Sequence, residues 1–204
     1  MGTAIPKNWL DVLVLAERSS PDLYLSRDEV AGHRYAAAMR LGFDELRLAG
    51  YFCVQDVPTI AFLVQERLDL DQIDDVHEAL WNQSLATLLF VITDDELRAY
   101  SLACRPARHD KEPESTTDRR LIEIFHLVSQ ATELRDLVTG VESGRLVSDK
   151  PRAFDFRERV DRVLLDNLVV THNQLQSKGL TNGAAQALLM QAMFIAYLED
   201  REII

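Results

Sequence analysis

The strongest constraint on the fold is a pair of almost wholly apolar runs separated by one amphipathic segment. TIAFLVQ begins at Thr59 and LATLLFVIT begins at Leu85. Apolar runs of this length without polar alternation are typical of strands that are covered on both faces. Between the two runs, apolar residues recur at helical spacing, at Ile73, Val76, Leu80 and Trp81. This order predicts a strand, a crossover helix and a second buried strand.

The flanking segments add further strands. LRLAGYFCVQ alternates around Gly50, and Asp56-Val57-Pro58 after it predicts a tight hairpin turn in which proline sets one backbone angle. After the second buried run, an acidic corner at 94–96 leads into LRAYSLA, which predicts another strand. The chain is therefore expected to form an α+β (α/β-like) fold with a small mixed β-sheet and one crossover helix, followed by a helical region.

Helical patterns occupy both ends of the chain. We expect helices over 7–18 and over 27–41, the second with Ser26 as its N-cap and Gly42 at its end. Beyond a polar linker at 104–118, we expect helices over 118–139, over 156–178, and from Thr181 onward. The expected domains are 1–110 for the sheet module with its N-terminal helices, 111–155 for a linker and connecting helix, and 156–204 for the helical region.

Composition narrows the class of protein. Hydrophobic residues make up 47% of the 204 residues and the net charge is -11. A globular core is therefore expected, and a broad phosphate-binding surface is disfavoured, although a local basic spot around Arg105, Arg108 and Lys111 stays open. Cys53 and Cys104 are expected to be buried and unpaired, because no CxxC spacing occurs. The chain has no signal-peptide pattern and no apolar run long enough to span a bilayer, so we expect no membrane association and a cytoplasmic location.

Common catalytic and ligand-binding motifs are missing from the sequence. It contains no GxGxxG, GxxxxGK[ST], GxSxG or HExxH. The five histidines fall in separate predicted elements, so each is expected on a surface or helix face rather than at a metal; they are His33, His77, His109, His126 and His172. The acids Asp69, Asp71, Asp74 and Asp75 are expected to form a solvated helix start.

Two blocks of sequence carry a family resemblance. The first is DVPTIAFLVQERLDLDQIDDVHEALWNQSLATLLFVITDDELRAYSLACRP, and the second runs from Phe156 to the end of the chain. Together they resemble the amino-terminal region of bacterial N6-adenine DNA methyltransferases of restriction-modification and phage-defence systems, of the type IIG fused or phage-exclusion kind. In that family a Phe-Ile-x-Tyr-Leu-Glu-Asp-Arg string leads into the methyltransferase domain, and 194–201 match it here.

The methyltransferase motifs themselves are not in this chain. The Gly-rich loop that binds S-adenosylmethionine and the Asn/Asp-Pro-Pro-Tyr/Phe motif that holds the adenine both lack a counterpart. Two alternatives follow: an amino-terminal region of a longer protein, which we expect, or a stand-alone accessory protein. S-adenosylmethionine is thus implied for the parent protein only, and this segment is expected to need no cofactor and to be non-catalytic by itself.

The first block also resembles a restriction-nuclease core, where one strand supplies an Asp and the next a Glu-x-Lys. The acids hold the metal that activates water, and the Lys stabilises developing charge. In this chain Asp44 is the only plausible counterpart of the Asp. Leu63 stands in the place of the Glu, and Gln65 in the place of the Lys. Leucine cannot bind a hard cation and glutamine carries no charge, so the resemblance implies a vestigial site. Glu66 is one residue out of register and should face the other way. Gln83 could be the polar residue that the following helix aims at the site.

Three functions remain open. The first is a non-catalytic amino-terminal region of a DNA methyltransferase that positions DNA or partner subunits. The second is an active Mg-dependent endonuclease that uses Asp44 and Glu66. The third is a protein-binding regulatory module. Expected partners are the rest of the methyltransferase chain, DNA, and defence-system subunits.

Two structural expectations accompany these functions. The apolar face of 186–198 should be exposed or covered by a second copy of the chain. Trp81, Asn82 and Gln83 are expected to form a structural hinge, with Asn82 and Gln83 bonded to the free carbonyls of the helix end.

Overall fold

The computed structural model describes residues 9–106 and 118–200. The chain divides into two compact units, the first ending at Arg159 and the second beginning at Val160. The first unit holds the whole sheet, and the second is a pair of helices.

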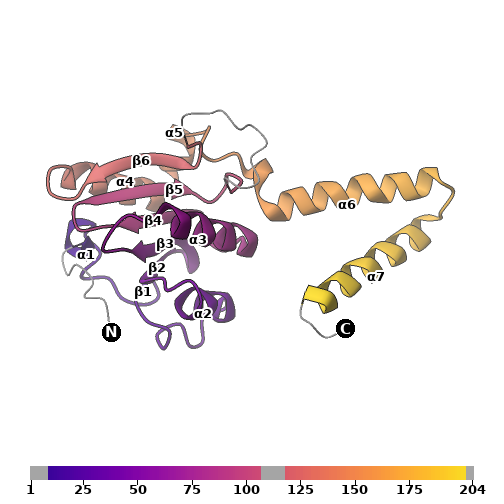
Figure 1. Ribbon diagram of the computed structural model, residues 1–204, viewed down its shortest axis with the longest axis horizontal. Helices are drawn as coiled ribbons and strands as arrows, with labels where there is room; N and C mark the ends of the chain where they lie inside the picture. The colour runs from indigo at the N-terminus through magenta and orange to yellow at the C-terminus, as the bar shows by residue number, and fades with distance from the viewer. Residues whose placement is uncertain (1–8, 107–117, 201–204) are drawn as a thin grey trace. The chain divides into compact units, whose positions relative to one another are not determined.

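A mixed six-stranded sheet organises the first unit (Figure 1). Its strands lie side by side in chain order: β1 (Leu23–Tyr24), β2 (Gly50–Val54), β3 (Val57–Val64), β4 (Leu88–Ile92), β5 (Glu96–Ser101) and β6 (Leu121–His126). β3 and β4 are parallel and are joined by the crossover helix α3 (Leu70–Gln83), while every other neighbouring pair is antiparallel. The predicted α+β fold, with a mixed sheet and a crossover helix, is confirmed.

The two central strands are buried on both faces, as their apolar runs predict. Phe62 and Phe90 point into one core cluster, which α1 (Trp9–Val12), α4 (Ala131–Glu142) and α5 (Arg145–Asp149) complete. Leu63 and Val91 point into the other, which is covered by α2 (Ala36–Asp44) and α3. Each such side chain contributes about 1.5–3 kcal/mol of burial free energy, so β3 and β4 anchor the fold.

Helix α3 begins and ends through local polar contacts. Asp69 is its N-cap, and the Asp69 carboxylate accepts a hydrogen bond from the Gln72 backbone N–H at 3.1 Å. At the other end Ser84 adopts a left-handed conformation, with φ 53°. The Ser84 N–H donates to the carbonyls of Leu80 and Trp81, both at 3.1 Å. The predicted bonding of these carbonyls by Asn82 and Gln83 is therefore wrong, because the residue after them closes the helix.

The predicted hairpin turn is displaced by one residue. Gln55 and Asp56 occupy the turn, with φ 52° and 61°, and Pro58 already lies within β3 opposite Cys53. Two positive φ angles identify the turn type that matches the right-handed twist of the adjoining strands. Backbone twist therefore sets this turn, rather than the fixed angle of proline.

The helix predicted over 118–139 is wrong in its first half. Residues Leu121–His126 form the edge strand β6, and α4 begins only at Ala131. Leu121, Ile124 and Phe125 fit a helical period, but pairing with β5 satisfies the backbone of this segment instead. The helices predicted over 7–18 and 27–41 are also shorter than expected, at 9–12 and 36–44.

Gly42 does not end α2 but lies inside it, fully covered. A Cβ atom there would overlap the Tyr51 hydroxyl and approach the Leu48 Cδ1 atom to 2.8 Å. The glycine therefore lets the helix backbone approach β2 closely, which explains its place within the helix.

The second unit contains α6 (Val160–Ser177) and α7 (Asn182–Asp200), and Gly179 between them has φ 95°. These helices and the glycine turn match the sequence pattern. Apolar residues in 186–198 are exposed as predicted, namely Leu188, Met190, Met193, Phe194 and Ile195. Among the described residues, no helix combines the length and apolar character needed to cross a bilayer.

Candidate functional site

The five positions predicted for a vestigial nuclease site lie in different surroundings. Leu63 is 1% exposed within β3, packed in the core beneath α2 and α3. Glu66 follows the end of β3 and is exposed. Asp44 is the last residue of α2, and its Oδ2 atom lies 3.1 Å from Nε of Arg27. The two acids of the nuclease alternative are thus a surface ion-pair member and an exposed loop residue.

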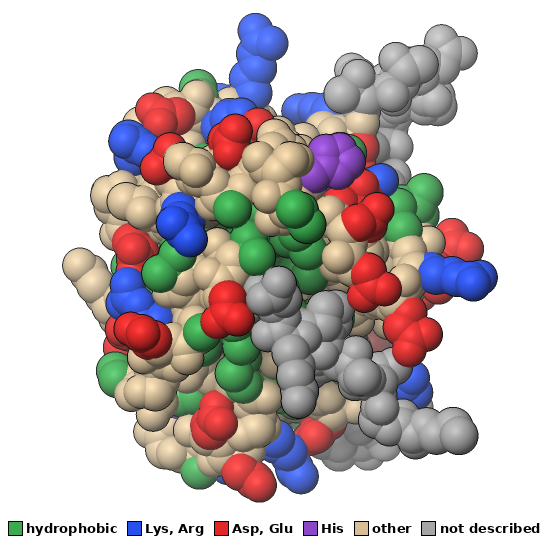
Figure 2. Space-filling model, turned by 90° about the vertical axis from the view of Figure 1, so that its left-hand side faces the viewer, with side chains coloured by type: hydrophobic (Ala, Val, Ile, Leu, Met, Phe, Trp, Pro, Cys, Tyr) green, Lys and Arg blue, Asp and Glu red, His purple; other side chains and the backbone are tan. Residues whose placement is uncertain are grey.

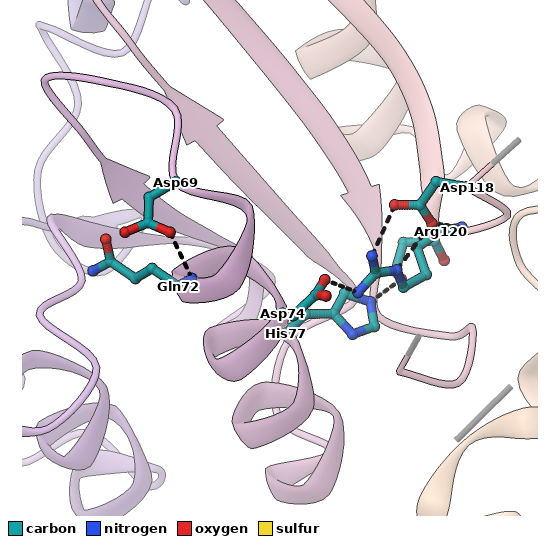
Figure 3. A network of polar contacts seen from close by, with 7 residues as sticks. Asp69, Gln72, Asp74, His77, Asp118 and Arg120 are labelled. Atoms are coloured by element: carbon teal, nitrogen blue, oxygen red, sulfur yellow. Dashed lines mark hydrogen bonds and ion pairs between the residues drawn. The ribbon is translucent and has the colours of Figure 1, made fainter. Parts of the chain in front are cut away.

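Gln65 has a structural role at the exit of β3. Its side-chain NH₂ group donates to Gln72 Oε1 at 2.8 Å, and its Oε1 accepts from the Asp69 N–H at 3.2 Å. Asp69 in turn caps α3 through Gln72, as Figure 3 shows. The residue in the place of the nuclease lysine therefore fastens the loop between β3 and α3. Its side chain is 7% exposed and its amide is satisfied on both sides.

Gln83 does not join the other positions. It is the last residue of the 14-residue helix α3, and Gln65 lies just before the first turn. At 1.5 Å per residue, the helix separates the two by about 21 Å. The expectation that Gln83 is aimed at the nuclease positions is therefore not met. Among described residues, no group of three or more His, Cys, Asp and Glu side chains is placed to hold a metal ion.

A buried polar network lies on the other side of α3 (Figure 3). His77 is fully buried, and its Nε2 atom lies 2.9 Å from the Ser101 carbonyl oxygen in β5. Because a carbonyl only accepts, Nε2 carries the proton. The Nδ1 atom of His77 is buried and has no hydrogen-bond partner among the described residues.

Arg120 holds two carboxylates beside this histidine. Its Nε and Nη2 atoms donate to Asp118 at 2.9 and 2.8 Å, and its Nη1 atom lies 2.7 Å from Asp74 Oδ1 on α3. The Arg120 side chain is 8% exposed. The guanidinium therefore joins the start of β6 to the crossover helix, and Figure 3 shows the residues converging.

The pKa values in this network follow from burial and from Arg120. Burial lowers the pKa of His77 to about 4, partly opposed by the Ser101 hydrogen bond, and Arg120 lowers it further. Burial alone would raise the pKa of Asp118, but the hydrogen bonds and charge of Arg120 outweigh it and lower that pKa. His77 is thus neutral and the carboxylate charged near pH 7. A neutral, fully buried imidazole fits a structural role.

An open cleft of about 880 Å³ lies next to this network. Its lining residues lie between Asp118 and Ile122, where the chain enters β6, and between Asp149 and Arg157, from the last residue of α5 onward. Four of its lining side chains are cationic: Arg119, Lys150, Arg152 and Arg157. This is a local concentration of positive charge on a chain whose net charge is -11.

Ser101 links the buried network to the cleft. Its carbonyl accepts from His77, and its N–H donates to the Arg120 carbonyl at 2.7 Å. Its hydroxyl donates to the Ala153 carbonyl on the cleft segment. The next residue, Phe154, is 5% exposed in the sheet core. These contacts fix the backbone register of the segment that carries Arg152 and Arg157.

The sequence contained a signal for part of this site. His77 shares its helix face with Ile73, Val76 and Leu80, at the spacing of a buried stripe. This spacing implies that His77 is buried in the core. The separation of the five histidines along the chain, which was used for the prediction, bears only on whether they could share a metal site. The roles of Arg120 and Asp118 were not predicted, because the segment that forms β6 has the apolar spacing of a helix.

Of the residues predicted for a basic spot, Arg105 is exposed. Arg108 and Lys111 lie outside the described residues, as do His109 and Arg201.

Charges of both signs are interspersed on the face drawn in Figure 2. Comparison with known proteins found no match among family models, curated proteins or solved structures.

Proposed function

We propose that this chain is a non-catalytic amino-terminal region of a DNA (adenine-N6) methyltransferase of a restriction-modification or phage-defence system, acting in the cytoplasm. Its sheet unit is a nuclease-like scaffold that has lost metal chemistry and positions DNA or partner subunits. S-adenosylmethionine belongs to the parent protein. The methyltransferase assignment rests on the resemblance of the two sequence blocks.

One observation carries the non-catalytic part of the proposal. The two positions where a restriction nuclease has Glu and Lys hold a core leucine, Leu63, and a glutamine whose amide is fully used, Gln65. Leucine offers no oxygen to a divalent cation, and an uncharged glutamine cannot stabilise developing charge as the lysine does. The hairpin of β2 and β3, the crossover helix α3 and the parallel strand β4 support the nuclease-like scaffold.

A cleavage assay tests this part. The purified chain is incubated with supercoiled plasmid and either Mg²⁺ or Mn²⁺, beside an Asp44→Ala, Glu66→Ala variant. We expect no nicking above a no-protein control for either protein. Metal-dependent cleavage that disappears in the variant would establish the endonuclease instead.

A protein-binding module is the second candidate, and the exposed apolar residues of α7 favour it. Met190 and Phe194 are 71% and 61% exposed, and apolar residues occur on every side of this helix. Helices that are apolar all round are normally buried against other protein. Co-purification with one defence-system subunit, together with no retention of DNA at low salt, would favour this candidate over the first.

A further inference from the structure

We propose that the hairpin of α6 and α7 is a dimerisation element, which pairs with the same hairpin of a second copy of the chain in an antiparallel arrangement. The second units of the two copies then form a four-helix bundle. The inference goes beyond the proposed function and rests on α6 and α7 alone, so either one can fail without the other.

The composition of the hairpin suits the interior of an assembly. From Asn167 to Leu198 the only Asp, Glu, Lys or Arg residue is Lys178, whereas these four types make up 27% of the whole chain. Loss of charge together with an excess of Met and aromatic residues is typical of the core of a protein interface. A helix that stays in water normally keeps one charged face, which α7 lacks. The hairpin is therefore expected to be covered by other protein.

The two helices leave their facing sides uncovered. They meet near the turn, where Ala185 is fully buried, and Figure 1 shows them diverging from there. Farther along, Leu164 on α6 and Leu188 on α7 are 48% and 46% exposed. Leu188 lies one turn after Ala185, and Leu164 lies one turn before the partly buried Leu168, so both belong to the facing sides. Each hairpin thus presents an open apolar side that further helices can fill.

A second copy fits this side because the two helices are matched in length. α6 has 18 residues and α7 has 19, so they are about 27 and 28 Å long. Two such hairpins can cover each other along their whole length. A two-fold contact of this kind uses the same patch on both copies, so the patch needs to complement only itself.

The exposed apolar surface is large enough for a stable dimer. Nine large apolar side chains of the hairpin are 44% to 71% exposed: Leu164, Leu165, Val169, Val170, Leu188, Met190, Met193, Phe194 and Ile195. With about 100 Å² of apolar surface in each, roughly half of it exposed, they offer on the order of 500 Å² per copy. Homodimer interfaces are about 65% apolar, so this corresponds to about 800 Å² per copy, which is the usual size of a stable interface.

The charges at the two ends of the hairpin favour the antiparallel arrangement. The turn carries Lys178, and the open end carries four acids and two arginines, a net charge of -2. These six residues are Asp161, Arg162, Asp166, Glu199, Asp200 and, counted from the sequence alone, Arg201. In an antiparallel pair, each lysine lies beside the acidic open end of the other copy. In a parallel pair the two acidic ends would lie together and repel, so charge sets the orientation.

The first experiment measures the mass of the full 204-residue chain by sedimentation equilibrium over a range of concentrations. The wild type is expected at twice the mass of the 23.2 kDa chain. The variant Leu188→Lys, Ile195→Lys places two charges on the facing side of α7 and should raise the dissociation constant of the dimer by about 100-fold. Lysine is a good helix former, and circular dichroism checks that the helices remain.

The matched control is Leu70→Lys, Val128→Lys. It adds the same two charges at apolar residues of the first unit that are 58% and 92% exposed. The control should keep the wild-type dissociation constant.

A second experiment tests the orientation through disulfide formation under mild oxidation. The variant Lys178→Cys, Glu199→Cys should give a crosslinked dimer. Within one copy the two positions are separated by the length of α7, about 28 Å, so a disulfide between them has to join two copies. Lys178→Cys alone should crosslink no more than the wild type, whose Cys53 and Cys104 are buried.

Four outcomes would overturn the proposal or part of it. A monomeric wild type at every concentration, or a dimer that persists unchanged in Leu188→Lys, Ile195→Lys, would overturn the dimer. Equal dissociation in the control would show that the hairpin is not the interface. Crosslinking by Lys178→Cys alone would contradict the antiparallel arrangement. Capture of a different protein by a monomeric wild type, lost in the α7 variant, would assign the hairpin to that partner instead.

Discussion

The side chain of Arg159 is bonded to Ser84, 75 residues earlier, at the point where α3 gives way to the strand β4. Its Nη2 atom donates to the Ser84 carbonyl at 2.6 Å, and its Nε atom donates to the Ser84 hydroxyl at 3.2 Å. Arg159 is the last residue of the first unit. The corner after Trp81, Asn82 and Gln83 is therefore held by a residue from the far end of the unit.

Replacing Arg159 with Met should destabilise the first unit by about 1–2 kcal/mol, because charge-assisted hydrogen bonds to the end of α3 are lost. Urea unfolding followed by circular dichroism measures this free energy. Arg157→Met is the matched control: its side chain is 84% exposed, so its loss should change stability by less than about 0.5 kcal/mol. Equal stability of the two variants would show that the Ser84 contact contributes nothing.

His77 predicts a distinct pH dependence of stability. Its pKa is about 4 in the folded chain and 6.5 when unfolded, so between these values the unfolded chain binds the proton and the folded chain does not. The free energy of unfolding should therefore fall as the pH drops from 6.5 to 4, by about 3 kcal/mol from this residue. Urea unfolding of the wild type and of His77→Gln is measured across this range. The difference between the two proteins gives the contribution of His77 to the free energy of unfolding, because the other titrating groups are common to both. Parallel curves for the two proteins would contradict the buried, neutral assignment.

Gly42→Ala should destabilise the first unit by about 1–3 kcal/mol, because the new methyl group overlaps the Tyr51 hydroxyl. Gly183→Ala is a matched glycine change in α7, where a Cβ meets nothing within 4 Å. It should leave stability unchanged or raise it by up to about 1 kcal/mol. Thermal unfolding of the two variants measures the change in stability that each substitution causes. If Gly42→Ala leaves the stability unchanged, α2 can move away from β2 without cost.

The central part of the fold was predictable from sequence because its signals are local and strong. The runs that form β3 and β4 are long and apolar, and α3 between them carries Asp69 as a cap and an apolar stripe. The edge of the sheet was not predictable in the same way. β6 is exposed along much of its length, so Leu121, Ile124 and Phe125 fit a helix as well as a strand, and only pairing with β5 decides between them.

The candidate cleft depends on contacts between distant segments, which no local pattern encodes. Arg119 and Arg152 are separated by α4 and α5, and they line one cleft because Ser101 holds Ala153 against the sheet. The sequence did indicate that any basic site must be local, since the net charge is -11. The expectation of a vestigial nuclease site also came from residue types alone, since the resemblance puts Leu63 and Gln65 where such an enzyme has Glu and Lys.

The most direct test of the account is to measure N6-methyladenine in DNA from cells that express the complete open reading frame containing this chain. Nucleoside mass spectrometry quantifies the modified base, and sequencing that detects base modification gives its position. The account predicts N6-methyladenine at one defined sequence, absent from cells that carry an empty vector. Unmethylated DNA from cells in which the protein is present and folded would contradict the assignment to a DNA adenine methyltransferase.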